Sequence, residues 1–116
     1  MAGGLSIHVV DISRGLPAAG MRVEVYRLGD ARRRIGGGAL DDRGLFDLSA
    51  AGPALTPGVY EVVFHVAGFY RDADLSLPDP PFLDEVPFRF GVADPAAHYH
   101  LPLKVSPWGF SLFRGA

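Results

Sequence analysis

The sequence contains no cysteine among its 116 residues, which excludes disulfide bonds, thiolate metal sites and cysteine nucleophiles. It also lacks an excess of charge, because 11 Lys and Arg residues and 13 Asp and Glu residues leave a formal net charge of -2 at pH 7. No basic stripe with interleaved aromatic residues is present, so we expect no nucleic-acid partner. The one basic cluster, Arg32–Arg34, is interpreted as part of a solvated hairpin.

Long hydrophobic runs are absent as well. No apolar stretch approaches the ~20 residues that cross a membrane. The N-terminal residues lack the basic and apolar regions of a signal peptide. Together with the missing cysteine, these absences predict a cytoplasmic protein that has no membrane partner.

Turn-forming residues, in contrast, are abundant. The 15 glycines and 10 prolines predict frequent turns and little helix. The length is that of one domain, which we expect to span residues 1–116.

Alternation of apolar and polar side chains is the main secondary-structure signal. Met21, Val23 and Val25 share one face of Met21–Leu28, the pattern of a half-buried strand. Related patterns predict strands at Leu5–Val10, Val59–Val66, Val86–Val92, His98–Val105 and Phe110–Ala116. Gly36–Gly38 is interpreted as a flexible turn, and Gly68–Asp74 as the one short helix. Seven or eight short strands at this spacing predict an all-β fold, a two-sheet β-sandwich.

Two histidines lie on the non-core faces of their predicted strands. His8 shares its face with Val10, and His100 shares its face with His98 and Pro102. Solvated or structural histidines are one interpretation of this pattern. However, a sheet face that carries both imidazoles and apolar groups more often becomes a partner interface or lines a cavity. The pattern therefore favours an oligomer with a ligand site in its seam.

A metal site is an alternative explanation for the histidines. The His98-x-His100 spacing places two possible ligands on one strand face. No neighbouring carboxylate or cysteine in the sequence completes a first coordination shell, so we predict no metal. The chain also lacks a serine nucleophile elbow and a dinucleotide-binding glycine motif.

Motifs near both ends of the chain resemble those of the transthyretin-like family, and in particular its 5-hydroxyisourate hydrolases. Leu5-Ser6-Ile7-His8-Val9-Val10-Asp11 with Arg14-Gly15-Leu16-Pro17-Ala18 is similar to the family's N-terminal signature. His98–Pro107 and Phe110–Ala116 are similar to its two C-terminal motifs, and Asp42-Arg43-Gly44 falls at its Asp-Gly-Arg turn.

The resemblance implies a transthyretin-like sandwich and a homotetramer built as a dimer of dimers, with a small-molecule substrate in a channel between subunits. It implies that His8 and His100 act in acid–base catalysis, adding water to a ring carbonyl of the substrate without a metal or organic cofactor. It also places Arg114, the residues at positions 45, 113 and 116, and the neighbouring His98 and Arg43 among the candidate substrate-binding residues.

Three of these positions depart from the family pattern. Leu45 stands where the family has Arg, Phe113 replaces its closing Tyr, and Ala116 replaces its terminal Ser. Each change removes a hydrogen-bond donor, and loss of one transition-state donor costs roughly 2.7–4 kcal/mol. Arg114 is retained, and Arg43 is a candidate replacement for the missing guanidinium.

Three functions fit these observations. The first is a diverged family hydrolase that uses its His pair on a cyclic carbonyl compound more apolar than 5-hydroxyisourate. The second is a genuine 5-hydroxyisourate hydrolase that tolerates the substitutions. The third is a non-catalytic carrier of small molecules, as transthyretin is.

Overall fold

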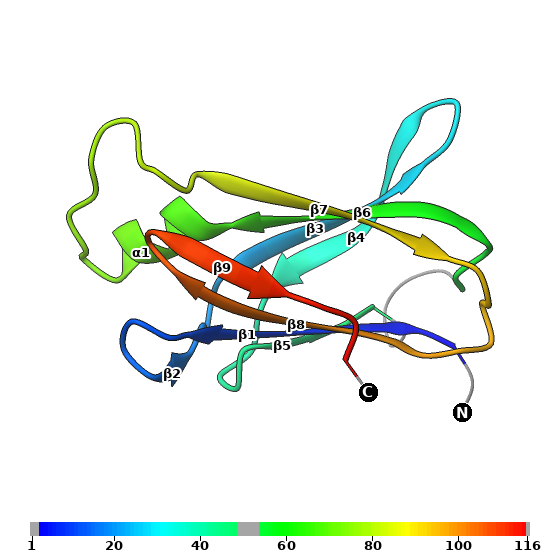
Figure 1. Ribbon diagram of the computed structural model, residues 1–116, viewed down its shortest axis with the longest axis horizontal. Helices are drawn as coiled ribbons and strands as arrows, with labels where there is room; N and C mark the ends of the chain where they lie inside the picture. The colour runs from blue at the N-terminus through cyan, green and yellow to red at the C-terminus, as the bar shows by residue number, and fades with distance from the viewer. Residues whose placement is uncertain (1–2, 49–53, 116) are drawn as a thin grey trace.

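The computed structural model describes residues 3–48 and 54–115, which form nine strands and one short helix (Figure 1). The elements are β1 (Leu5–Asp11), β2 (Leu16–Pro17), β3 (Arg22–Leu28), β4 (Arg32–Ala39), β5 (Leu45–Asp47), β6 (Gly58–His65), α1 (Val66–Asp72), β7 (Glu85–Val92), β8 (Tyr99–Ser106) and β9 (Gly109–Leu112). No helix in this part of the chain is long and apolar enough to span a membrane.

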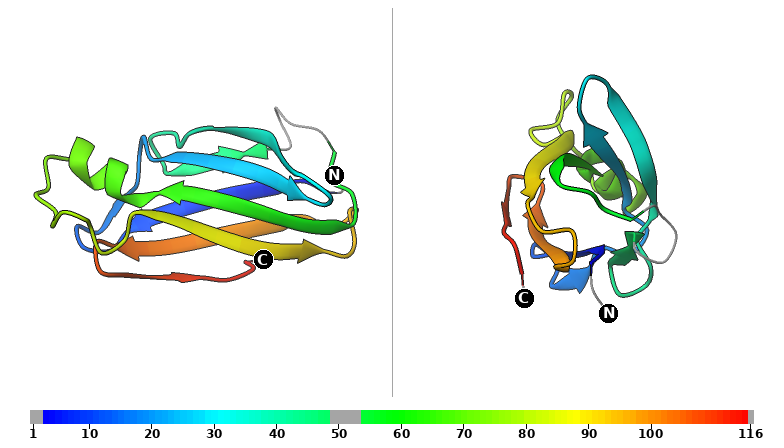
Figure 2. Two further views of the ribbon diagram at one scale, coloured as in Figure 1. Left: turned by 90° about the horizontal axis from the view of Figure 1, so that it is seen from above. Right: turned by 90° about the vertical axis from the view of Figure 1, so that its right-hand side faces the viewer.

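The strands form two sheets that pack face to face (Figure 2). The four-stranded sheet has the order β4-β3-β6-β7. In the five-stranded sheet, β1 pairs with β2 and β5 on one side and with β8 on the other, and β9 follows β8. The predicted all-β, two-sheet sandwich with one short helix is therefore confirmed. The described residues form nine strands rather than the predicted seven or eight, because β2 and β5 are only two and three residues long and leave no alternating pattern in the sequence.

The core lies between the sheets, and alternation explains how it forms. Every second residue of β1 and of β8 is buried, so one face of each strand contributes only apolar side chains over most of its length. The four-stranded sheet contributes Val23, Val25, Tyr60, Val62 and Phe64 from the opposite side. Burial of these apolar surfaces is the main favourable term in forming the sandwich.

One strand pair determines where the candidate site residues meet. β1 and β8 are parallel and adjacent, although more than 80 residues separate them, and Ser6 lies opposite His100 in their register. The two strands therefore begin at the same end of the sandwich, and both termini lie in the half of the molecule away from α1 (Figure 1).

The structure corrects two details of the sequence interpretation. Gly36–Gly38 is not a flexible turn but part of β4, together with Arg32–Arg34. Gly37 is needed for packing, because a Cβ atom there would lie 2.6 Å from the backbone carbonyl oxygen of Val23. The helix runs from Val66 to Asp72 rather than from Gly68 to Asp74, and it is anchored to the core by the burial of Val66, Ala67, Phe69 and Tyr70.

Candidate active site

The outward face of the five-stranded sheet carries both histidines singled out in the sequence. In β1, the residues between the buried positions are Ser6, His8 and Val10, all half-buried. In β8, His100 and Pro102 occupy the equivalent half-buried positions. Because the two strands are neighbours, these side chains form one continuous surface.

One row of side chains on this surface is apolar except for its imidazole. His8 lies opposite Leu45 of β5 on one side and Pro102 of β8 on the other. The register of β8 and β9, extended by one residue, sets Phe113 opposite Pro102, and Phe113 is 50% exposed. The structure therefore brings His8, Leu45 and Phe113 together, with carbon side chains beside the imidazole where the family resemblance expects polar groups.

The adjacent row is polar and joined by hydrogen bonds. The hydroxyl oxygen of Ser6 lies 2.7 Å from Nδ1 of His100 and 2.8 Å from Nε2 of His98. The other ring nitrogen of His98, Nδ1, lies 2.9 Å from the carbonyl oxygen of Gly3. The hydroxyl group of Ser6 in β1 thus links the imidazole of His100, in β8, to that of His98, which directly precedes β8.

The electrostatics of this row favour a neutral His100. Burial lowers the pKa of His100 below its usual range, and positive charge on His8 and His98 lowers it further. Near neutral pH, His100 is therefore uncharged and able to accept a proton.

Gly115 closes the same row at the C-terminal side. Its backbone N–H donates to the carbonyl oxygen of His100 at 2.7 Å. A Cβ atom at this position would lie 2.8 Å from Cδ2 of the His100 ring and 3.2 Å from Cδ of Pro102. Glycine therefore allows the end of the chain to run directly against the imidazole.

Arg43 lies in the turn that leads into β5. Asp41 accepts hydrogen bonds from the backbone N–H groups of Leu45 and Arg43, which lower its pKa, and the charges of Arg43 and His8 lower that pKa further. The chain turns at Gly44, where φ is +75°. The extended backbone that would put Arg43 and Leu45 on the same face is therefore absent, although Arg43 and His8 both influence one carboxylate.

Arg114 meets the histidine row only through the backbone of His98. Its guanidinium lies 4.1 Å from the centre of the Tyr99 ring, and Nη2 donates to the carbonyl oxygen of His98. It also lines an apolar cavity of about 230 Å³ with Phe88 and Phe90 of β7. Ala116, the remaining candidate, lies outside the described residues.

Ser6 is the residue of this face to which the sequence analysis assigned no role. Its position two residues before His8 places it on the same strand face, which the sequence does show. Its contact with the two histidines depends on the parallel pairing of β1 with β8, and no local signal in the sequence predicts that pairing.

Within residues 3–48 and 54–115, no group of three or more His, Cys, Asp or Glu side chains could hold a metal ion.

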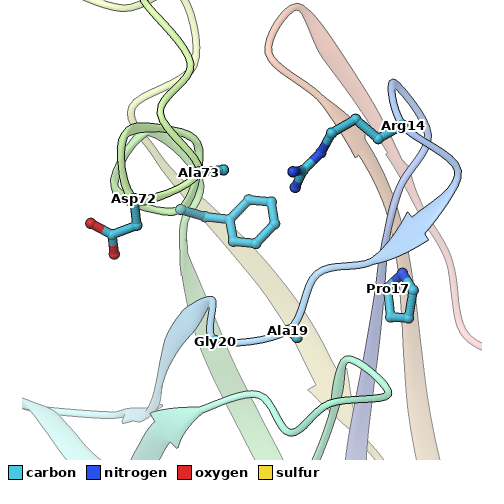
Figure 3. A pocket seen from close by; sticks show the side chains of 7 residues that line it. Arg14, Pro17, Ala19, Gly20, Asp72 and Ala73 are labelled. Atoms are coloured by element: carbon cyan, nitrogen blue, oxygen red, sulfur yellow. The ribbon is translucent and has the colours of Figure 1, made fainter.

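A separate concavity of about 300 Å³ lies between α1 and the segment that connects β1 to β3 (Figure 3). Arg14 reaches across it toward Phe69, and none of its lining residues is a histidine. It is therefore distinct from the histidine face.

The model of the HIUase/Transthyretin family matches residues 5–115 of this chain. The chain belongs to the HIUase/transthyretin family. Its curated relatives include 5-hydroxyisourate hydrolase 2 of Rhizobium meliloti, which is 44% identical over 99% of this chain and 98% of the relative. The resemblance inferred from the two ends of the sequence is thus confirmed, and the relative's activity agrees with the prediction of a hydrolase of this family.

Solved structures extend the comparison. The 5-hydroxyisourate hydrolase of Klebsiella pneumoniae is 27% identical, with a TM-score of 0.82 over 98% of this chain and 99% of that one. The (S)-allantoin synthase structure is 37% identical, with a TM-score of 0.88, but this chain covers only 44% of that protein. Sea bream transthyretin, 22% identical with a TM-score of 0.83 over 97% of this chain and 94% of that one, shows the shared fold.

Proposed function

We propose that this protein hydrolyses 5-hydroxyisourate. The observation that carries the proposal is the placement of His8 and His100 on one half-buried sheet face, in a chain that belongs to this family. Support comes from the relative named 5-hydroxyisourate hydrolase 2, which is 44% identical over almost the whole chain. This similarity favours the genuine hydrolase over the diverged enzyme among the hypotheses raised by the sequence.

The reaction adds water to a ring carbonyl and breaks the adjacent carbon–nitrogen bond. Neutral His100 takes a proton from the attacking water while the new carbon–oxygen bond forms. The proton then passes to the leaving nitrogen as the ring opens. His8 lies on the neighbouring strand, one row away, and is suited to stabilise the oxyanion that develops on the carbonyl oxygen.

A second candidate function rests on the apolar row. Leu45 lies directly opposite His8, and half-exposed Phe113 lies at the far end of the same row. Neither side chain offers a donor to a polar ring, which favours a cyclic carbonyl compound with less polar substituents. Hydrolysis of 5-hydroxyisourate remains the preferred function, because it is the activity for which the similar relatives are named, and no change of substrate between them and this chain has to be assumed.

The proposed active form is a homotetramer, a dimer of dimers, with the histidine face lining a channel between subunits. Support comes from the half-exposed apolar groups on this sheet and from the family resemblance. In such an assembly, a neighbouring subunit would cover the face and separate the substrate and its attacking water molecule from bulk solvent. A carrier such as transthyretin would use the same channel for binding without turnover.

The decisive experiment follows the ultraviolet decay of 5-hydroxyisourate generated in situ from urate. We expect rapid decay with the wild type and a loss of about 10²–10⁴-fold in His8→Ala and His100→Ala, the usual contribution of an acid–base group. His65→Ala is the matched control, because His65 lies in the four-stranded sheet between Glu24 and Glu85.

Wild-type decay no faster than the uncatalysed reaction would contradict the proposal. If the Leu45→Arg, Phe113→Tyr variant then gained activity on 5-hydroxyisourate, the result would support the second candidate function, in which the wild-type enzyme acts on a less polar substrate. Continued inactivity of that variant, together with binding of an apolar ligand in the channel, would support the carrier.

A further inference from the structure

The hydrogen bonds around Ser6 have only one consistent direction when both histidines are neutral. The carbonyl oxygen of Gly3 can only accept, so Nδ1 of His98 carries the proton of that ring. Nε2 of His98 is then an acceptor, and it receives the hydroxyl proton of Ser6. The Ser6 oxygen is left to accept, and its remaining partner is Nδ1–H of His100.

This direction determines which nitrogen of His100 is basic. A neutral imidazole has one N–H and one lone pair, so a proton on Nδ1 leaves the lone pair on Nε2. Free histidine in water prefers the opposite tautomer, with its proton on Nε2. The chain of contacts from Gly3 through His98 and Ser6 therefore selects the form that solution chemistry disfavours.

We propose that Ser6 and His98 are positioning residues that hold His100 in its Nδ1–H tautomer and so make Nε2 the base of the site. This role rests on the proposed hydrolytic function. Neither residue needs to touch the substrate, since each acts through His100. The lowered pKa of His100 agrees with this role, because a tautomer is defined only for the neutral ring.

The same arrangement suits the whole reaction cycle. When Nε2 of His100 takes the proton from water, the ring becomes an imidazolium whose Nδ1–H still donates to Ser6. When Nε2 returns that proton to the leaving nitrogen, the ring reverts to its starting tautomer. No further proton transfer is needed before the next turnover.

Ser6→Thr and Ser6→Val form a matched pair for the test, because Thr and Val have nearly the same shape and differ by a hydroxyl group. ¹⁵N NMR of histidine-labelled protein reports the tautomer, with the His100 signals assigned by their absence in His100→Ala. We expect a protonated Nδ1 and a bare Nε2 in the wild type and in Ser6→Thr. In Ser6→Val, we expect protonation to shift toward Nε2.

Kinetics provide the second readout. Loss of the hydrogen bond that orients a metal-bound histidine typically costs about 10–100-fold in activity, and we expect a comparable effect here. The kcat of Ser6→Val should fall by that factor, while Ser6→Thr stays within threefold of the wild type. His98→Ala, which leaves the Ser6 hydroxyl free to turn toward Nδ1 of His100, should also lower kcat.

A wild-type His100 that carries its proton on Nε2 would overturn the inference, whether or not Ser6→Val folds. Equal kcat values for folded Ser6→Val and Ser6→Thr would overturn it as well. Because the tautomer is measured without substrate, the predicted tautomer in a protein that does not hydrolyse 5-hydroxyisourate would refute the proposed reaction while supporting the positioning role.

Discussion

At the scale of single residues, the outward face divides into a polar and an apolar row. Ser6 and His100 form the polar row with Gly115, whereas His8 lies between Leu45 and Pro102. The substitutions that distinguish this chain from the family pattern at positions 45 and 113 both fall in the apolar row. The hydrogen-bonded support of His100 is thus spatially separate from the altered positions, which explains how the chain can change one without the other.

Gly115→Ala tests how closely the end of the chain approaches the imidazole of His100. The added methyl group would meet the His100 ring at 2.8 Å, so the imidazole or the terminal segment must move. Because displacement of about 1 Å can cost 10²-fold in rate, we expect kcat/KM to fall by about that factor with little change in Tm. Gly109→Ala, where nothing lies within 4 Å of the added atom, is the control. Equal activity of the two variants would contradict this account.

At the scale of elements, β1 carries the outward side chains of the candidate site and ends at a buried carboxylate that holds the fold together. Ser6 and His8 point outward, but Asp11 at the end of β1 is fully buried. Asp11 accepts hydrogen bonds from Arg14 at 2.6 Å, from Ser13, and from the hydroxyl of Tyr70 in α1 at 2.7 Å. Burial alone would raise the pKa of Asp11, yet these hydrogen bonds outweigh it and hold the pKa below its usual range. The carboxylate therefore joins β1, the following loop and α1.

Asp11→Ala should destabilise the fold by about 1–3 kcal/mol at pH 7, because the buried hydroxyl of Tyr70 loses its carboxylate acceptor, whereas Arg14 is 44% exposed and can return to water. The folded pKa of Asp11 is lowered, so its contribution exists above the unfolded value of about 3.9 and disappears as pH falls through the folded value. Urea unfolding should thus show a smaller difference between wild type and variant at pH 3 than at pH 7. Exposed Asp30 provides the control, and a pH-independent difference for Asp11→Ala would contradict the assignment.

At the scale of the whole molecule, large apolar side chains remain exposed on or beside the five-stranded sheet. They include Ile12 and Leu16 at the β1–β2 connection, and Phe110 and Phe113 along β9 and just beyond it. Val59, Leu75 and Phe82 are exposed elsewhere on the molecule, but the register of β8 and β9 places Phe113 on the histidine face itself. An exposed aromatic side chain beside imidazoles is typical of an interaction surface, and it supports the proposed tetramer, in which subunits cover the histidine face.

Leu16→Glu tests that assembly. Leu16 is 51% exposed, and a charge there would have to lose water if a second subunit covers it. We expect the wild type to have a mass of about 50 kDa by light scattering, four times the 12.4 kDa chain, and Leu16→Glu to have a smaller mass and lower activity. Leu75→Glu, 42% exposed after α1, is the control. A wild-type monomer that is fully active would refute the assembly.

The sequence by itself determined the strands other than β2, β4 and β5, the sandwich, and the outward direction of His8 and His100, because these follow from alternation within a single strand. Family motifs at the two ends added the expectation of one shared site. Only the tertiary structure decided that Ser6 lies between His98 and His100, that Leu45 lies opposite His8, and that Arg114 lies over Tyr99. Those contacts depend on which strands pair and in what register. Pairing is set by how two whole sheets bury their apolar faces, which no local pattern records.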